Sequence, residues 1–362
     1  MTTFTQQLGP QARGRGARSN ATGRFETAQR EGFDDGWAPD DPEPPRLITT
    51  VEPEKARVMI SRNDSPDIGF SASINPYRGC EHGCIYCYAR PAHAYMGLSP
   101  GLDFESKLFF KPEAARLLEA ELSKPGYRVE TVHIGGNTDP YQPQERTLRV
   151  TRGIIEVLCR FSHPFSAISK STLITRDIDL LAPMAARNLA RVAISITTLD
   201  RALARSMEPR AATPEKRLEA VRRLSDAGIP VIVMFAPVIP GLNDHELESV
   251  LERAAEAGAK GAGYVALRLP REIKDLFREW LETDQPDRAG RVMSLVRQMR
   301  GGKDYDAQWG SRMTGQGPLA QLIADRFRAA KKRYGLNYAW DGLDQTAFKV
   351  PAKVGDQVDL FG

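Results

Sequence analysis

Three cysteines lie close together in the run Cys80-Glu81-His82-Gly83-Cys84-Ile85-Tyr86-Cys87. A C-x3-C-x2-C loop can present three thiolates to a cubane iron–sulfur cluster, and it leaves the fourth iron without a protein ligand. Thiolates are the side chains that hold such clusters, and an open iron is a place where a substrate or cofactor can coordinate. The spacing therefore predicts a 4Fe–4S cluster held by Cys80, Cys84 and Cys87.

Other metal and redox sites are the alternatives for this loop. Cys84 and Cys87 alone form a C-x-x-C pair, which also occurs in zinc and redox sites, and His82 could complete a Cys3His zinc site. Structural zinc sites usually draw their ligands from two separated pairs, and no second C-x2-C pair follows in the sequence. The chain has only four cysteines in 362 residues and shows no secretory signal, so we expect reduced thiols and a cytoplasmic location.

The residues around the cysteines resemble a known family. The cysteine spacing, with Tyr86 just before the third cysteine, resembles the signature of the radical S-adenosylmethionine (SAM) superfamily. Three stretches resemble the bacterial radical SAM family related to spore photoproduct lyase: Ser65-Pro66-Asp67, Asn75-Pro76-Tyr77-Arg78-Gly79-Cys80 and Cys87-Tyr88-Ala89-Arg90-Pro91. The resemblance implies a partial (β/α)6 TIM-like barrel, a 4Fe–4S cluster and SAM as cofactors, and an electron donor protein as a partner.

The hydrophobic pattern predicts the elements that would position this loop. Runs of β-branched residues predict strands over residues 71–75, 128–134, 165–169, 191–197, 230–235 and 263–267. The segments between them predict helices over residues 112–122, 147–160, 178–188, 214–227 and 245–257. Strands that alternate with helices indicate an α/β fold with a parallel sheet, in which chemistry gathers at the carboxyl ends of the strands.

Composition divides the chain into four parts. Residues 1–45 lack apolar periodicity and predict a mostly disordered extension, which residues 46–300 follow as the radical SAM core. Residues 301–340 predict a helical C-terminal extension, and residues 341–362 predict a flexible tail. The net charge of +4 is compatible with a nucleic-acid partner without requiring one. No apolar run approaches the roughly 20 residues that cross a bilayer, so we expect no membrane partner.

The resemblance also implies cofactor-binding residues after the strands. Gly135 and Gly136 match the segment that contacts the SAM amino group, and Asn137 stands where the superfamily often has an acidic residue. Lys170 is either a surface lysine or a cation near the SAM carboxylate. The remaining candidates are Tyr86 in the cysteine loop, Ser195 and Thr197 for the ribose or carboxylate, Arg210 for the carboxylate, and Ile239 for packing on adenine.

Together these features predict an enzyme that cleaves SAM reductively to a 5′-deoxyadenosyl radical and acts on DNA or a nucleotide-like substrate. Spore photoproduct lyase uses an extra cysteine after its second strand to return a hydrogen atom, and residues 135–139 contain none. Cys159 has the apolar neighbours of a core residue, whereas Tyr141 could donate instead. The alternatives are a non-catalytic iron–sulfur or zinc module recruited to the sliding clamp, and a radical SAM enzyme for a protein or metabolite. No catalytic residue is identified.

The last residues, Gln357-Val358-Asp359-Leu360-Phe361-Gly362, resemble the bacterial sliding-clamp-binding motif, with Val358 in place of the usual Leu. Leu360 and Phe361 would fill an apolar pocket of the clamp while Gln357 bonds beside it. The alternative is that the tail folds back onto the protein's own surface. In the C-terminal extension, Tyr305 and Trp309 could stack on a base, but we expect them to anchor the extension to the barrel.

Overall fold

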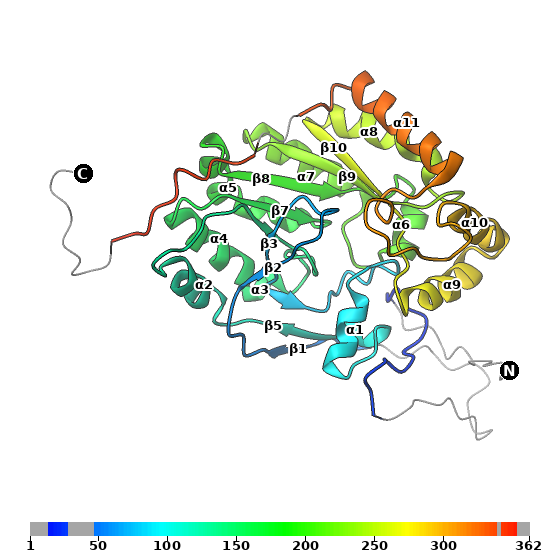
Figure 1. Cartoon of the computed structure of the whole chain (residues 1–362), viewed down its shortest axis with the longest axis horizontal. Helices are drawn as coiled ribbons and strands as arrows, with labels where there is room; N and C mark the ends of the chain where they lie inside the picture. Colours follow the sequence, from blue (N-terminus) through cyan, green and yellow to red (C-terminus); the bar gives the residue numbers. More distant parts are fainter. Residues whose placement is uncertain (1–13, 28–46, 339–341, 353–362) are drawn as a thin grey trace.

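The computed structural model describes residues 14–27, 47–338 and 342–352. Its main sheet has the order β10-β9-β8-β7-β6-β3-β2, and every neighbouring pair from β3 to β10 is parallel (Figure 1). The short strand β2 pairs with β3 in the antiparallel direction and forms the edge. The strands are β2 (Ile60–Arg62), β3 (Ala72–Ile74), β6 (Val132–Ile134), β7 (Phe165–Ser169), β8 (Ala190–Ser195), β9 (Val231–Val238) and β10 (Gly261–Ala266).

Helices follow these strands and cover one side of the sheet. The larger core cluster lies between the two layers and includes Ile134 of β6, Ile194 of β8 and Leu158 of α4. Six parallel strands in chain order, each linked to the next through helices, make the predicted partial (β/α)6 barrel. The covering helices are α2 (Ala114–Leu122), α4 (Val150–Arg160), α5 (Ile178–Ala186), α7 (Pro214–Asp226) and α8 (Leu247–Glu256).

Local signals explain where these elements begin and end. The Thr213 side chain accepts a hydrogen bond from the Lys216 backbone and caps α7, and Pro214 occupies the first turn. Gly258 follows α8 with φ +95, a left-handed conformation that a side chain would strain. These boundaries agree with the predicted helices to within a few residues.

A second, smaller sheet supports the cysteine loop. Its order is β1-β5-β4, with β1 (Thr50–Pro53) parallel to β5 (Lys107–Phe110) and β4 (Tyr77–Arg78) antiparallel to β5. The loop leaves β4 through Gly79, which has φ +71, and a Cβ there would meet Leu108 at 2.7 Å. The loop then enters η1 (Arg90–Met96), and α1 (Leu102–Ser106) follows. This sheet was not predicted, because its strands are only two and four residues long.

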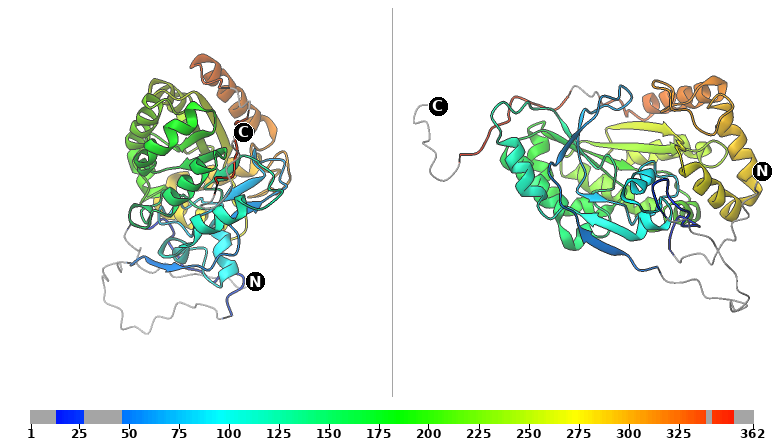
Figure 2. Two further views of the ribbon diagram at one scale, coloured as in Figure 1. Left: turned by 90° about the vertical axis from the view of Figure 1, so that its left-hand side faces the viewer. Right: turned by 60° about the horizontal axis from the view of Figure 1, so that its bottom comes forward.

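Residues 14–27, which lie within the predicted N-terminal extension of residues 1–45, are held against the core. Arg15 is buried and donates hydrogen bonds to the Glu105 and Leu47 carbonyl oxygens, at 2.7 and 2.8 Å. Arg18 makes a bidentate pair with Asp284, with Nε donating to one carboxylate oxygen and Nη2 to the other. Figures 1 and 2 show this dark-blue segment beside α1. Polar contacts fix this segment, which is why apolar periodicity does not mark it in the sequence.

The chain closes with α9 (Ile273–Asp284), α10 (Pro286–Gln298) and α11 (Gly317–Arg333). Helix α11 packs beside α8, where Arg326 pairs with Glu248 at 2.6 Å (Figure 1). The segment before α11 is held by Arg312, which donates to Asp67. Trp309 does not anchor this extension, because 56% of its surface is exposed. None of the helices in the described ranges is both long and apolar enough to span a membrane.

Candidate active site

The cysteine loop brings three free thiols together at the mouth of the barrel. Cys80 and Cys84 are buried and Cys87 is half-buried. The loop turns through Gly83, which has φ +68, and two backbone hydrogen bonds tighten it: Gly83 to the Cys80 carbonyl and Cys87 to the Cys84 carbonyl. Burial raises the pKa of Cys80 and Cys84, and the Cys87 thiol nearby adds to both shifts.

The donor set fits an iron–sulfur cluster. A buried thiolate is costly unless positive charge compensates it, and iron ions would supply that charge to Cys80, Cys84 and Cys87. Within the described part of the chain, no group of three His, Cys, Asp or Glu side chains is arranged to hold a metal ion. That finding gives no support to a Cys3His zinc site with His82.

An arginine that the sequence interpretation did not single out holds the loop. Arg90 is fully buried and donates to the Cys84 carbonyl at 2.9 Å and to the Gly83 carbonyl at 3.0 Å. Its charge is paired with Glu105 at 2.5 Å, and both side chains are inaccessible to solvent. Glu105 also accepts hydrogen bonds from the backbone of Gly16 and Ala17. Arg90 lies in the stretch that carries the family resemblance, but nothing local marks Glu105.

Asp139 joins the loop to the ends of two strands. Its carboxylate accepts from the Ser169 hydroxyl and the Lys170 backbone, each at 2.7 Å, and His82 Nδ1 lies 3.3 Å away. Burial alone would raise the pKa of Asp139, but His82 and these hydrogen bonds outweigh it and hold the pKa at about 2. The ionised carboxylate therefore fixes the register between the cysteine loop and the turns after β6 and β7.

The structure brings Lys170 to the cysteine loop. Its Nζ lies 5.6 Å from the centroid of the Tyr86 ring. Its charge also opposes the effect of burial on the pKa of Cys84. A lysine with its ammonium group beside the loop suits an anionic group bound there, as expected for the SAM carboxylate.

Tyr86 and Thr197 belong to one buried polar network. The Tyr86 hydroxyl lies 3.2 Å from Thr197 Oγ1, and both hydroxyls donate to the Glu208 carboxylate. Arg217 pairs with Glu208 and donates to the Ser195 carbonyl. The network therefore links the cysteine loop to the end of β8 and to α7. Tyr86, Ser195 and Thr197 are buried in it, so little of their surface is open to a ligand.

The glycine turn after β6 lies beside the loop. Gly135 has φ +100, and a Cβ there would come within 2.7 Å of Pro140, so this position requires glycine. The Gly136 carbonyl accepts a hydrogen bond from the Tyr88 hydroxyl. Asn137 is exposed and its backbone donates to the Asn75 side chain at 2.7 Å. Tyr88, which directly follows Cys87, was not among the predicted cofactor-binding residues.

Three predicted residues lie where their expected roles are not supported. Arg210 pairs with Glu81 and donates to the Gly14 carbonyl. Ile239 is fully buried in the smaller core cluster, so its side chain offers no surface to adenine. Tyr141 is also fully buried, so its side chain offers no exposed surface to a substrate. Burial and Asp177 raise the pKa of Tyr141 well above the usual value, which keeps it a neutral phenol.

The other predicted residues are placed as follows. Cys159 packs against the larger core cluster, and its thiol lies 3.8 Å from the Leu180 carbonyl oxygen, as expected for a core residue. Gln357, Leu360 and Phe361 lie outside the described residues, so the predicted clamp-binding motif is not tested.

Comparison with known proteins identifies the class. The family model described as "Radical SAM superfamily" matches residues 74–254. The chain is 38% identical over 230 residues to an uncharacterised protein of Mycobacterium bovis, covering 63% of this chain and 68% of that protein. It is 28% identical over 192 residues to an uncharacterised protein of Methanocaldococcus jannaschii, covering 53% of this chain and 69% of that protein.

Solved structures of spore photoproduct lyase share the fold. The complex with dinucleoside spore photoproduct matches with a TM-score of 0.55 and 14% identity over 78% of each chain. A variant with bound AdoMet and dinucleoside spore photoproduct matches with a TM-score of 0.56. The chain therefore belongs to the radical SAM superfamily and has the fold of spore photoproduct lyase. It is a radical SAM enzyme whose cofactors are a 4Fe–4S cluster and SAM.

Proposed function

We propose that this radical SAM enzyme acts on DNA or a nucleotide-like substrate. The observation that carries the proposal is an aromatic ring and a cation at the mouth of the site. Tyr88 is 49% exposed, and the Arg268 guanidinium carbon lies 5.6 Å from its ring centroid. Nucleobases stack on such rings, and arginine attracts phosphate. Spore photoproduct lyase, which shares the fold, is described with a dinucleoside bound.

Each side chain near the loop has a proposed task. Cys80, Cys84 and Cys87 would hold the cluster, while Lys170 and the turn at Gly136 would bind the carboxylate and amino group of SAM. When bound, the cluster and SAM supply the one-electron chemistry that removes a hydrogen atom from the substrate. Tyr88 would align the substrate over the same opening, since its hydroxyl is fixed by the Gly136 carbonyl.

Desolvation keeps Tyr88 in the phenol form. Desolvation by the neighbouring groups raises the pKa of Tyr88 to about 12, and the Cys87 thiol adds to this shift whereas Arg268 opposes it. A neutral phenol ring beside a guanidinium group suits a nucleobase with its adjoining phosphate. The reaction itself is proposed to differ from the dimer repair of spore photoproduct lyase, because residues 135–139 contain no cysteine that could return a hydrogen atom.

Oligonucleotide binding by the reconstituted protein tests this proposal. We expect Tyr88→Leu and Arg268→Gln each to weaken affinity for a short single-stranded DNA about tenfold, within the roughly 1–3 kcal/mol of a stacked base. Tyr95→Leu is the matched control, because Arg24 lies 5.6 Å from the Tyr95 ring centroid and forms the same type of pair away from the loop. Equal affinity of all four proteins would contradict the proposal, provided that their iron contents agree.

We also propose that the last residues recruit the enzyme to the bacterial sliding clamp. The support is the motif itself, in which Gln357, Leu360 and Phe361 have the side chains that such a pocket takes. A doubly substituted chain, Leu360→Ala with Phe361→Ala, should lose binding to the purified clamp while it retains iron and SAM binding. Unchanged clamp binding by that variant, or none by the unaltered chain, would contradict recruitment.

A further inference from the structure

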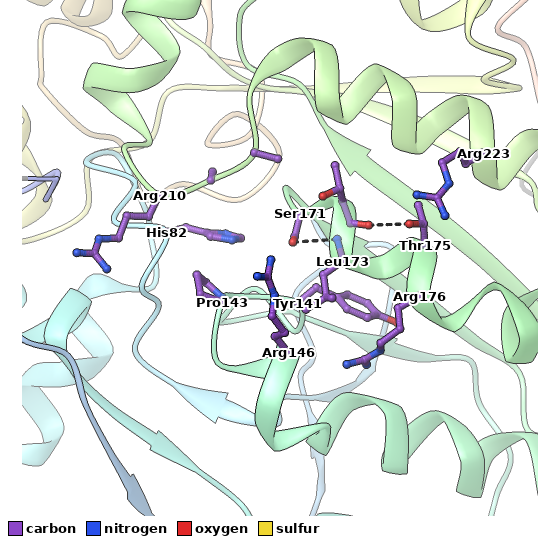
Figure 3. Close-up of a pocket in the computed structure, with 13 residues that line it drawn as sticks. His82, Tyr141, Pro143, Arg146, Ser171, Leu173, Thr175, Arg176, Arg210 and Arg223 are labelled. Atoms are coloured by element: carbon purple, nitrogen blue, oxygen red, sulfur yellow. Dashed lines mark hydrogen bonds between the residues drawn. The ribbon is translucent and has the colours of Figure 1, made fainter.

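A cavity of about 480 Å³ lies beside the cysteine loop and has a strongly basic lining. Its walls come from residues 141–146 after β6, residues 171–176 after β7, residues 210–212 just before α7, and α7 itself (Figure 3). His82 contributes the part of the wall that belongs to the cysteine loop. None of the three loop cysteines lines this cavity, nor do Lys170 or Gly136, so it is distinct from the expected SAM site.

Arginine dominates the charge of this cavity. Four arginines line it, and no Asp or Glu is among its lining residues. Arg176 is neutralised by Glu145 and Asp177, and Arg210 by Glu81. Neither the Arg146 nor the Arg223 guanidinium makes a hydrogen bond or ion pair to a residue in the described ranges, although Glu219, one turn before Arg223 on α7, is close enough for the two charges to interact. The Arg146 charge therefore faces the cavity without a bonded counter-charge, and the Arg223 charge is only partly compensated.

A buried histidine also lines the cavity. His82 is only 2% exposed, and its Nδ1 faces the Asp139 carboxylate at 3.3 Å. Figure 3 shows the His82 ring, the Ser171 hydroxyl and the Arg146 guanidinium directed toward the same space. Ser171 Oγ accepts from the Leu173 backbone, which leaves its own hydroxyl hydrogen available to donate. The Ser171 hydroxyl and the Arg146 guanidinium therefore present donors to one volume.

We propose that this cavity binds a phosphate group. Phosphate oxygens accept the bidentate hydrogen bonds that guanidinium groups offer, and a serine hydroxyl completes such a set. The volume falls within the range of about 300–1,000 Å³ that is usual for small-ligand pockets, so the phosphate would belong to a larger molecule. A free nucleotide and the phosphorylated end of a DNA strand share this chemistry. The inference does not depend on the substrate proposed above.

Such a ligand would contact the loop that holds the cluster. His82 lies between Cys80 and Cys84, and its carbonyl oxygen accepts a hydrogen bond from the Arg210 backbone at 3.3 Å. The bound phosphate ligand would therefore contact the cysteine loop while it leaves the SAM site free. We expect SAM and the phosphate ligand to bind at the same time.

Calorimetric titration of the cluster-reconstituted full chain in phosphate-free buffer tests the site. The probes are inorganic phosphate, ADP, and a dinucleotide with and without a 5′-phosphate. We expect saturable binding of ADP or of the 5′-phosphorylated dinucleotide, and about tenfold weaker binding in Arg146→Gln and in Arg223→Gln. Arg222→Gln is the matched control, because Arg222 is the exposed neighbour of Arg223 on α7 and does not line the cavity.

The four probes separate the two sources of phosphate. Tighter binding of ADP would assign the cavity to a free nucleotide, whereas a preference for the 5′-phosphorylated dinucleotide over the unphosphorylated one would assign it to a DNA end. SAM affinity should be unchanged in Arg223→Gln, which distinguishes this site from the cofactor site. Absence of saturable binding by any phosphate probe would overturn the proposal. Binding that both arginine variants leave unaltered would overturn it too.

Discussion

Arg90 and Glu105 form an ion pair at 2.5 Å with both side chains fully buried. Arg90 also donates hydrogen bonds to the Gly83 and Cys84 carbonyl oxygens. Glu105 also accepts hydrogen bonds from the backbone N–H groups of Gly16 and Ala17. The pair therefore links the cysteine loop to the N-terminal segment. The shape of the cluster site depends on this link as well as on the cysteines themselves.

Removing the charge of Glu105 should destabilise the protein. Glu105→Gln leaves the Arg90 guanidinium buried without a counter-charge, which costs about 3–5 kcal/mol of the free energy of unfolding. Chemical denaturation of the apoprotein measures the loss. Glu113→Gln is the control, because Glu113 pairs with Arg116 at an exposed position and should cost under about 1 kcal/mol. Equal losses in the two variants would contradict the role of the buried pair.

A side chain at position 16 should displace the cysteine loop. A Cβ on Gly16 would lie 1.8 Å from the Gly83 carbonyl oxygen, and neither backbone can move freely. We expect Gly16→Ala to lower the iron content after reconstitution and the thermal stability. Gly290→Ala is the control, because position 290 in α10 is open and helical alanine stabilises by about 0.5–1 kcal/mol relative to glycine. Normal iron content in Gly16→Ala would count against this contact.

Lys170 should contribute to SAM affinity more than to folding. Replacement by Gln removes the charge beside Tyr86, and losing a hydrogen bond to a charged group costs about 1.5–3 kcal/mol, so SAM should bind at least about tenfold more weakly. Equilibrium binding of SAM to reconstituted protein measures this. Lys216→Gln, which changes an exposed lysine on α7, should leave SAM affinity unchanged. An unaltered dissociation constant in Lys170→Gln would remove Lys170 from the site.

Stability should fall in mild acid because of buried histidines. Burial lowers the pKa of His93, His133 and His163 from 6.5 to about 4. Between these values the unfolded chain binds protons that the folded protein does not, so the free energy of unfolding rises with pH and levels off above about pH 6.5. Each histidine accounts for about 2 kcal/mol between pH 5 and pH 7.5.

Denaturation at several pH values checks this dependence. His163 makes hydrogen bonds to Tyr127 and to the Pro164 carbonyl, which Gln can partly replace. We expect His163→Gln to show a shallower fall in stability from pH 7.5 to pH 5 than the unaltered chain. A pH profile that is flat in that interval would be inconsistent with three buried neutral histidines.

The strands and helices of the barrel could be predicted from the sequence because the signals that mark them are local. The strand predicted over residues 165–169 is β7 itself, and Thr213 and Pro214 marked the start of α7. Hydrophobic periodicity and capping residues act over one element, so they can be read without the fold. The cysteine spacing was equally local.

The parts of the site that could not be predicted depend on contacts between residues far apart in the sequence. Arg90 could be noticed in its motif, but its partner Glu105 lies on another helix and looks like an ordinary charged residue. Residues 14–27 have no apolar pattern, yet buried hydrogen bonds such as that of Arg15 with Glu105 hold them. The burial of Ile239 and Tyr141 was missed for a related reason, since proximity to a strand end does not tell which way a side chain faces.

The most direct test is 5′-deoxyadenosine formation by the anaerobically reconstituted enzyme with SAM and a reductant, measured with and without DNA. The account predicts formation that increases with DNA and is abolished in Cys84→Ala. Formation of equal rate with and without DNA would contradict DNA as the substrate, whereas no formation by protein with a demonstrated cluster would contradict radical catalysis by this site.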